Sequence, residues 1–127
     1  KGHPLADAGC FPLESLNNSP FIQILPEQNT DLERLLHTYQ LTPDIRFTTS
    51  DNYTAYSMVA AGLGISVNNA LMTKNWQGPV VTLPLNPPQY ITLGIALPSS
   101  AKASPALQKF IACTKIVIQS QSHIETV

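Results

Sequence analysis

Charged side chains are scarce in this chain of 127 residues, in which Asp, Glu, Lys and Arg make up only 12%, against about 25% in an average soluble domain. Seven Lys and Arg face eight Asp and Glu, which gives a formal net charge of −1. A general phosphate-binding surface needs clustered Lys and Arg, so we do not expect this chain to bind nucleic acid directly. Hydrophobic residues, at 43%, still suffice for the core of one domain or of part of a larger one.

Long apolar segments are also missing. No run approaches the roughly 20 residues of a membrane span, and the first residues, from Lys1 to Asp7, lack the charged-then-apolar pattern of a secretory signal. The chain has no initiator Met, which indicates either processing or excision from a longer protein. We expect a cytoplasmic location and no membrane contact.

Metal ligands and disulfide frameworks are equally sparse. Cys10 and Cys113 are far apart in sequence. One long-range disulfide is an alternative, but the spacing favours two unpaired, buried thiols. The three histidines are His3, His37 and His123, and none has a second ligand at metal spacing. We therefore expect no metal and no other cofactor.

Signatures of catalysis are absent too. The chain has no G-x-S-x-G elbow and no pairing of a nucleophile with a base. Gly62-Leu63-Gly64 resembles the start of a dinucleotide loop, but Val67 replaces the third glycine. The segment also falls between a helix and a strand, whereas a phosphate loop lies between a strand and a helix. The sequence does not predict an enzyme.

The few charges are unevenly placed, because residues 52–101 contain only Lys74. Two interpretations remain open. Neutral polar side chains could solvate this surface, or the surface could be covered by a part of the protein that lies outside this chain.

What the chain does contain is an alternation of strand and helix patterns. Residues 13–16 predict a short helical turn, and 21–25, 45–49 and 65–67 predict strands. A capping box at Thr30–Glu33 predicts a helix that Pro43 stops. Asp51 predicts the cap of a second helix, and Gly62 the left-handed residue that ends it. The short connections predict parallel strands with right-handed crossovers, that is, a βαβαβ unit of the α/β class.

The rest of the chain is less regular. Residues 70–75 predict a weak helical turn, and 80–83 a further strand before a proline-rich stretch. Residues 90–97 alternate as a strand with one apolar face. Ser104 and Pro105 predict the start of a helix to residue 118, with its buried side at Leu107, Phe110, Ile111, Thr114, Val117 and Ile118. Residues 119–127 are polar and predict a frayed end.

Hydroxyl and amide side chains gather in the three strand-to-helix turns, at residues 26–30, 48–52 and 67–70. Ligands of open parallel sheets bind beyond the carboxyl ends of the strands, where helix N-termini present free N–H groups. Each turn also needs ordinary caps. However, one cap uses one oxygen, and Thr48, Thr49 and Ser50 supply three. These turns predict a site for a small polar molecule.

Three segments carry a resemblance to a known family. Gly2-His3-Pro4-Leu5-Ala6, Pro20-Phe21-Ile22 and Val59-Ala60-Ala61-Gly62-Leu63-Gly64-Ile65-Ser66 resemble the effector-binding domain of LysR-type transcriptional regulators. The strand from Val81, Gly94-Ile95-Ala96 and Ser104-Pro105-Ala106 continue the match, over roughly residues 1–118.

The resemblance implies an α/β fold like one lobe of a periplasmic binding protein, with a mostly parallel βαβαβ sheet flanked by helices. It implies a connector from the first lobe at 1–19, the second lobe at 20–88, and a return strand and helix belonging to the first lobe at 89–127. The effector sits between the lobes. The family's contacts carry over to Thr48, Thr49 and Ser50, and further to Asn52 and Asn68.

The implied function is effector sensing in a regulator that contacts DNA only through an N-terminal domain outside this chain. The alternative is part of a transporter's solute-binding protein, which has the same fold. We also expect a homo-oligomer. The apolar faces of 90–97 and 105–118 would otherwise stay bare, so they are expected to fold back on the βαβ unit or to pair with a second copy.

Overall fold

The computed structural model describes residues 2–26, 30–92, 94–96 and 104–120. The chain divides into two compact units, Lys1–Ile91 and Thr92–Val127, and each is described by itself. The assignment of the three segments to particular lobes stays a prediction.

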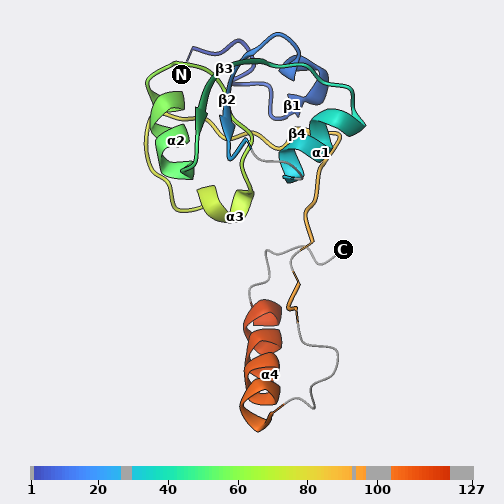
Figure 1. The fold of residues 1–127 in the computed structure, drawn as a ribbon. Helices are drawn as coiled ribbons and strands as arrows, with labels where there is room; N and C mark the ends of the chain where they lie inside the picture. Colours follow the sequence, from blue (N-terminus) through green and yellow to red (C-terminus); the bar gives the residue numbers. More distant parts are fainter. Residues whose placement is uncertain (1, 27–29, 93, 97–103, 121–127) are drawn as a thin grey trace. The chain divides into compact units, whose positions relative to one another are not determined.

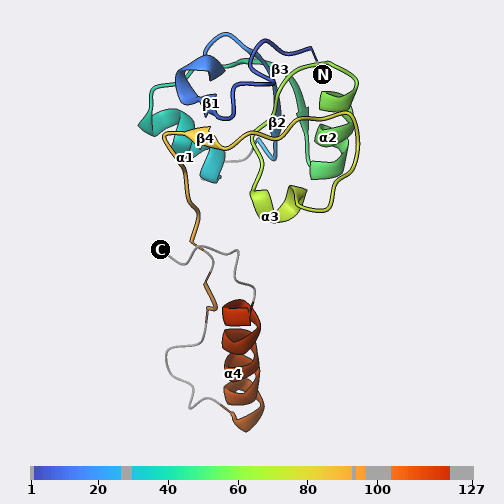
Figure 2. The same cartoon turned by 180° about the vertical axis from the view of Figure 1, so that it is seen from behind.

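The first unit contains most of the regular structure (Figures 1 and 2). Its strands are β1 (Phe11–Pro12), β2 (Pro20–Ile24), β3 (Asp44–Thr49) and β4 (Leu85–Asn86). Its helices are the 3₁₀ turn η1 (Leu13–Leu16), α1 (Asp31–Thr38), α2 (Asn52–Ala60) and α3 (Ala70–Thr73). The second unit contains α4 (Pro105–Ser120). In the described part of the chain, no helix is both long and apolar enough to cross a membrane.

The main sheet pairs β2 with β3 in parallel, so that Phe21 lies opposite Ile45 and Ile24 opposite Thr49. A register shift separates Phe21 from Ile22. On the other side of β2, the strand expected at 65–67 is reduced to a single parallel bridge between Phe21 and Ile65. The predicted parallel β-α-β-α order is therefore confirmed, but its third strand is only a contact point.

The core lies on one face of this sheet. Leu13 and Leu16 of η1 and Phe21 of β2 are almost fully buried, and Leu32, Leu35 and Leu36 of α1 are half-buried against them. The i, i+3, i+4 spacing of these leucines makes one face of α1 apolar. The other face of β2 buries Ile22, and Ala55 of α2 is also buried.

Helix α1 begins at the predicted capping box but ends sooner than predicted. Its last residue is Thr38, five residues before Pro43, so the expected stop at Pro43 is wrong. Instead, Gln40 adopts a left-handed φ of 52°. The N–H of Gln40 donates to the His37 carbonyl and that of Leu41 to the Leu36 carbonyl, at 3.3 and 2.8 Å. This pair of bonds is the Schellman motif.

Helix α2 ends in the same way, here at the predicted glycine. Gly62 has φ 79°, its N–H donates to the Val59 carbonyl, and that of Leu63 donates to the Met58 carbonyl, at 2.9 and 3.1 Å. Gly64 has a different role. A Cβ at this position would lie 2.6 Å from the Pro20 carbonyl oxygen, which accepts a hydrogen bond from the Ile65 N–H at 2.9 Å. The two glycines thus turn the chain and then let it reach β2.

Two predicted strands do not form. Residues 80–83 are irregular, and the chain pairs slightly later, where β4 runs parallel to β1 through Phe11–Leu85 and Pro12–Asn86. Residues 90–92 and 94–96 contain no strand either, whereas 93 and 97 lie outside the described residues. β-branched and alternating patterns predict a strand only where a neighbouring strand supplies hydrogen bonds, and these segments have none.

Helix α4 forms where it was predicted and continues two residues further, to Ser120. The hydroxyl of Ser104 accepts a hydrogen bond from the Leu107 N–H at 3.2 Å, so the expected cap is confirmed. The expected buried side is not buried as a whole: Leu107, Ile111 and Thr114 are half-buried, but Phe110, Val117 and Ile118 are exposed. Cys10 and Cys113 are both free thiols, as expected, but the expectation that they are buried is wrong: Cys10 is half-buried and Cys113 is exposed.

Candidate functional site

The carboxyl ends of β2 and β3 lie side by side, because Ile24 and Thr49 are paired in the parallel register. The bridge between Phe21 and Ile65 is also parallel, so the chain at Ile65 runs in the same direction as β2. Helices α1 and α2 begin at this edge of the unit, and α3 lies beside it, as both views show (Figures 1 and 2). We call the turns 48–52 and 67–70 at this edge the carboxyl-edge turns. Of the third predicted turn, 26–30, residues 27–29 lie outside the described residues.

The turn at 48–52 divides its hydroxyl groups between structure and solvent. The Thr49 hydroxyl accepts a hydrogen bond from the Asp51 N–H at 3.2 Å, which shapes the turn into α2. The side-chain oxygens of Thr48, Ser50 and Asn52 have no hydrogen-bond partner in the described chain. Of the four candidates here, Thr49 therefore has a local structural role, and the other three are free to bind a ligand.

Asp51 is the N-cap of α2, as predicted. One of its carboxylate oxygens accepts a hydrogen bond from the Thr54 N–H. Hydrogen bonds from the side chain of Thr54, and then from its backbone N–H, lower the pKa of the Asp51 carboxyl below its ordinary value. These bonds stabilise the ionised form, so this end of α2 carries a full negative charge at neutral pH.

Asn68 makes different contacts from the candidates at 48–52. Its side-chain amide nitrogen donates to the Ser66 hydroxyl at 3.5 Å, and the residue lines a hollow of about 550 Å³ inside the first unit. Thr48, Thr49, Ser50 and Asn52 do not line this hollow. The next residue, Asn69, caps α3 by accepting from the Leu71 N–H at 2.9 Å. The structure thus groups four of the five predicted residues and places the fifth toward a separate space.

The hollow is mostly apolar. Its walls include Ile65 and Val67, the irregular segment 80–83, and an aromatic pair in which Tyr56 of α2 lies 4.8 Å from Trp76 between ring centroids. The Tyr56 hydroxyl is buried without a hydrogen-bond partner, and it fills the space that a Cβ on Gly78 would need. The hollow lies where the third and fourth predicted strands fail to pair, so it is a consequence of the incomplete sheet rather than a shaped polar site.

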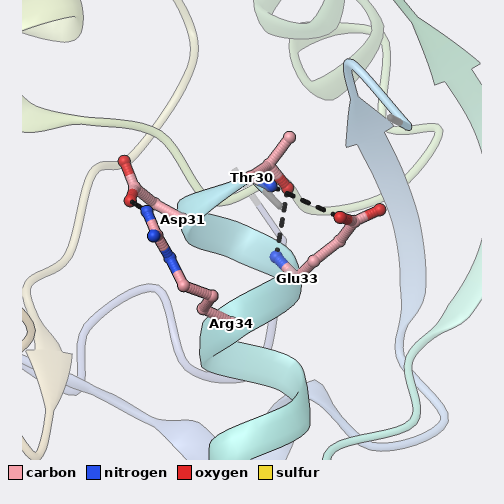
Figure 3. A network of polar contacts seen from close by, with 4 residues as sticks. All are labelled: Thr30, Asp31, Glu33 and Arg34. Carbon is pink, nitrogen blue, oxygen red and sulfur yellow. Dashed lines mark hydrogen bonds and ion pairs between the residues drawn. The ribbon is translucent and has the colours of Figure 1, made fainter. Parts of the chain in front are cut away.

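The start of α1 is acidic and carries a capping box (Figure 3). The Thr30 hydroxyl accepts from the Glu33 N–H at 3.2 Å, and the Glu33 carboxylate accepts from the Thr30 N–H at 3.3 Å. Asp31 pairs with Arg34 on the next turn. The sequence predicted this capping box, but not that the guanidinium of Arg34 is held by a carboxylate of the same helix.

One further candidate was missed at sequence level. Gln23 is a buried amide in the otherwise apolar strand β2, and it lies opposite Thr48 in the register. The signal was a polar residue at an inner position of a strand. Among the described residues, no cluster of three or more His, Cys, Asp or Glu side chains is arranged to hold a metal ion.

Three comparisons with known proteins give a family model, a curated relative and a solved structure of similar fold. A family model described as the LysR substrate binding domain matches residues 1–117. A curated relative, described as the uncharacterized HTH-type transcriptional regulator YvbU of Bacillus subtilis (strain 168), is 29% identical over 115 residues, covering 89% of this chain and 39% of the relative. A solved structure of the Synechocystis PCC6803 CcmR regulatory domain in complex with 2-PG matches with a TM-score of 0.72 and 20% identity, covering 91% of this chain and 58% of that one.

Proposed function

Because this chain belongs to the LysR substrate-binding domain family, with the α/β fold of a periplasmic-binding-protein-like lobe, we propose that it senses a small-molecule effector in a transcriptional regulator. It spans less than half the length of the curated relative and just under three-fifths of the solved regulatory domain. The DNA contact is proposed for a part of the regulator outside this chain. The role is sensing rather than catalysis.

The observation that carries the proposal is the group of free polar side chains at the end of β3. Thr48, Ser50 and Asn52 stand at the carboxyl edge of two parallel strands, with no partner in the described chain. A ligand that satisfied them would replace water without breaking an existing protein hydrogen bond. Thr49 supports the site by fixing the turn, and Asn68 is proposed as a contact from the neighbouring turn.

The named relatives support this proposal. The curated relative is a transcriptional regulator by its description, and the structural relative is a regulatory domain with a small molecule bound. An effector held between two lobes would favour one arrangement of the regulator over another. It could shift that equilibrium only by its difference in affinity for the two states, typically about 1–3 kcal/mol. A homo-oligomer in the cytoplasm is the proposed setting.

The test is a screen of metabolites against the ¹⁵N-labelled chain, with amide chemical shifts as the measurement. We expect binders to shift the amides of residues 48–52. Thr48→Val and Ser50→Ala should weaken these binders severalfold, because each removes a hydroxyl that the ligand would otherwise satisfy.

Thr38→Val is the matched control, because Thr38 is an exposed threonine at the other end of α1. It should leave the affinity unchanged. If binders act only on residues around Tyr56 and Trp76, the hollow is the binding site and the proposed one is wrong.

A further inference from the structure

The helices that begin at the carboxyl edge carry acidic rather than basic groups at their N-termini. Asp31 and Glu33 occupy the first turn of α1, and Asp51 is the cap of α2. The positive end of a helix dipole normally attracts an anionic ligand. Here each of these two ends is already next to a carboxylate of the chain itself.

The same carboxylates take up N–H groups that an anion would need. Glu33 accepts from the Thr30 N–H, and Asp51 accepts from the Thr54 N–H. A carboxylate or phosphate arriving at the start of α2 would have to displace Asp51 from this bond or accept its charge as a neighbour. Like charges a few ångströms apart repel each other even in water.

The nearby cations are largely committed elsewhere. Arg34 pairs with Asp31, and the Nε of Arg46, two residues before Thr48 in β3, pairs with the Asp44 carboxylate at 2.8 Å. Lys74 follows α3 at the end of that helix away from Asn69. Among the described residues, the turn at 48–52 therefore presents neutral hydroxyl and amide groups beside one carboxylate, and the cation of the adjoining strand, Arg46, is already paired with Asp44.

Resting on the proposed function, we infer that the part of the effector facing this lobe is neutral or positively charged. Hydroxyl, amide and ammonium groups fit the turn at 48–52, because they can donate to Asp51 and exchange hydrogen bonds with Thr48, Ser50 and Asn52. Carboxylate and phosphate groups do not fit. The chain thus selects a polyol, an amide or an amine at this end of the site.

The experiment uses small probes in matched sets of three: a carboxylic acid, the corresponding primary amide and the corresponding primary amine. Each is titrated into the ¹⁵N-labelled chain at low salt, and the amides of residues 48–52 are followed. We expect amides and amines to bind more tightly than carboxylates.

Asp51→Asn tests the cause, since Asn is an equally good N-cap and keeps α2 intact. It should raise carboxylate affinity roughly threefold to tenfold, the range for one like charge at about 6 Å with a local dielectric between those of water and a protein surface. Glu14→Gln is the matched control. It removes a negative charge from the exposed side of η1, which precedes the amino end of β2, and should change nothing.

The outcomes separate this inference from the proposed function. Carboxylates that bind residues 48–52 as tightly as their amides, or an Asp51→Asn variant without effect, would overturn the inference and leave the site in place. Carboxylate binding that Lys74→Gln abolishes would also overturn it. If no probe in any set shifts residues 48–52, the effector site itself is wrongly located.

Discussion

Gly64 shows how one missing side chain holds two elements together. Its backbone passes so close to β2 that a Cβ would lie 2.6 Å from the Pro20 carbonyl oxygen. The obstacle is backbone, which cannot rotate away. Gly64→Ala should therefore lower the free energy of unfolding by about 1–3 kcal/mol, the usual cost of overpacking, as measured by urea unfolding followed by Trp76 fluorescence.

Gly94→Ala is the matched control for Gly64→Ala, because a Cβ at Gly94 would meet no atom within 4 Å. It should be almost neutral. Equal unfolding free energies for Gly64→Ala and the parent chain would mean that the contact with Pro20 is not as tight as the structure has it.

Asp51 links stability to pH in a defined direction. Hydrogen bonds from Thr54 lower the pKa of this carboxyl in the folded chain, so its stabilising effect is complete above its ordinary pKa. The effect is lost as the pH falls through the lowered value. Asp51→Asn should remove this dependence, because the amide caps without ionising.

The measurement for Asp51 is urea unfolding of the parent chain and Asp51→Asn between pH 7 and pH 3. We expect the stability of the parent chain, relative to the variant, to decrease only at the acidic end. A difference that stays constant over the whole range would show that Asp51 does not titrate differently in the folded and unfolded chains.

At the scale of secondary-structure elements, the turn that follows α1 contains a residue unsuited to its backbone conformation. Gln40 holds φ at 52°, which costs a residue with a Cβ roughly 1–2 kcal/mol. Gln40→Gly removes this strain but adds entropy to the unfolded chain. The net gain should be about 0.5–1 kcal/mol, visible as a rise in Tm of roughly 2–8 °C.

Gln40→Ala separates the two explanations for such a gain. Alanine keeps the strain and loses only the polar side chain, so it should give no increase in Tm. An equal increase in both variants would assign the effect to the side chain and not to the left-handed backbone.

The elements also show what local sequence could and could not predict. The capping box at Thr30, the cap at Asp51 and the turn at Gly62 were predictable, since each depends on residues a few positions apart. The pairing of Phe11–Pro12 with Leu85–Asn86 was not, because strand formation depends on a distant partner. The left-handed conformation of Gln40 was not predictable, because glutamine is not typical of that position at the end of a helix.

The candidate site likewise has features that the sequence could predict and features that it could not. That Thr48, Thr49 and Ser50 follow a strand was readable from the sequence. That Thr49 is used by the turn, whereas Thr48 and Ser50 stay free, depends on hydrogen-bond geometry. The placement of Gln23 opposite Thr48 depends on the register, which the sequence did not determine.

For the whole molecule, the exposed apolar face of α4 has consequences for association. Phe110 is 59% exposed and Val117 is 53% exposed, and they lie on the same stripe of the helix because they are seven residues apart. Exposed apolar stripes promote association. We expect the chain to self-associate in size-exclusion chromatography with light scattering, and Phe110→Gln to shift it toward monomer.

Lys115→Gln, a polar exchange on the same helix, should leave the association state of the chain unchanged. A parent chain that remains monomeric at high concentration and binds no hydrophobic dye would contradict the expectation that this face needs a covering partner.

Both long helices of the first unit close with the same hydrogen-bonded turn, at Gln40 and at Gly62, just before the chain re-enters the sheet. Backbone hydrogen bonds therefore fix the chain at one end of the strands. At the other end, side chains such as Thr48, Ser50 and Asn52 contribute little to the stability of the fold. Substitutions of these side chains would change the ligand preference with little loss of stability. A scaffold of this kind is suited to the evolution of binding sites for many different compounds.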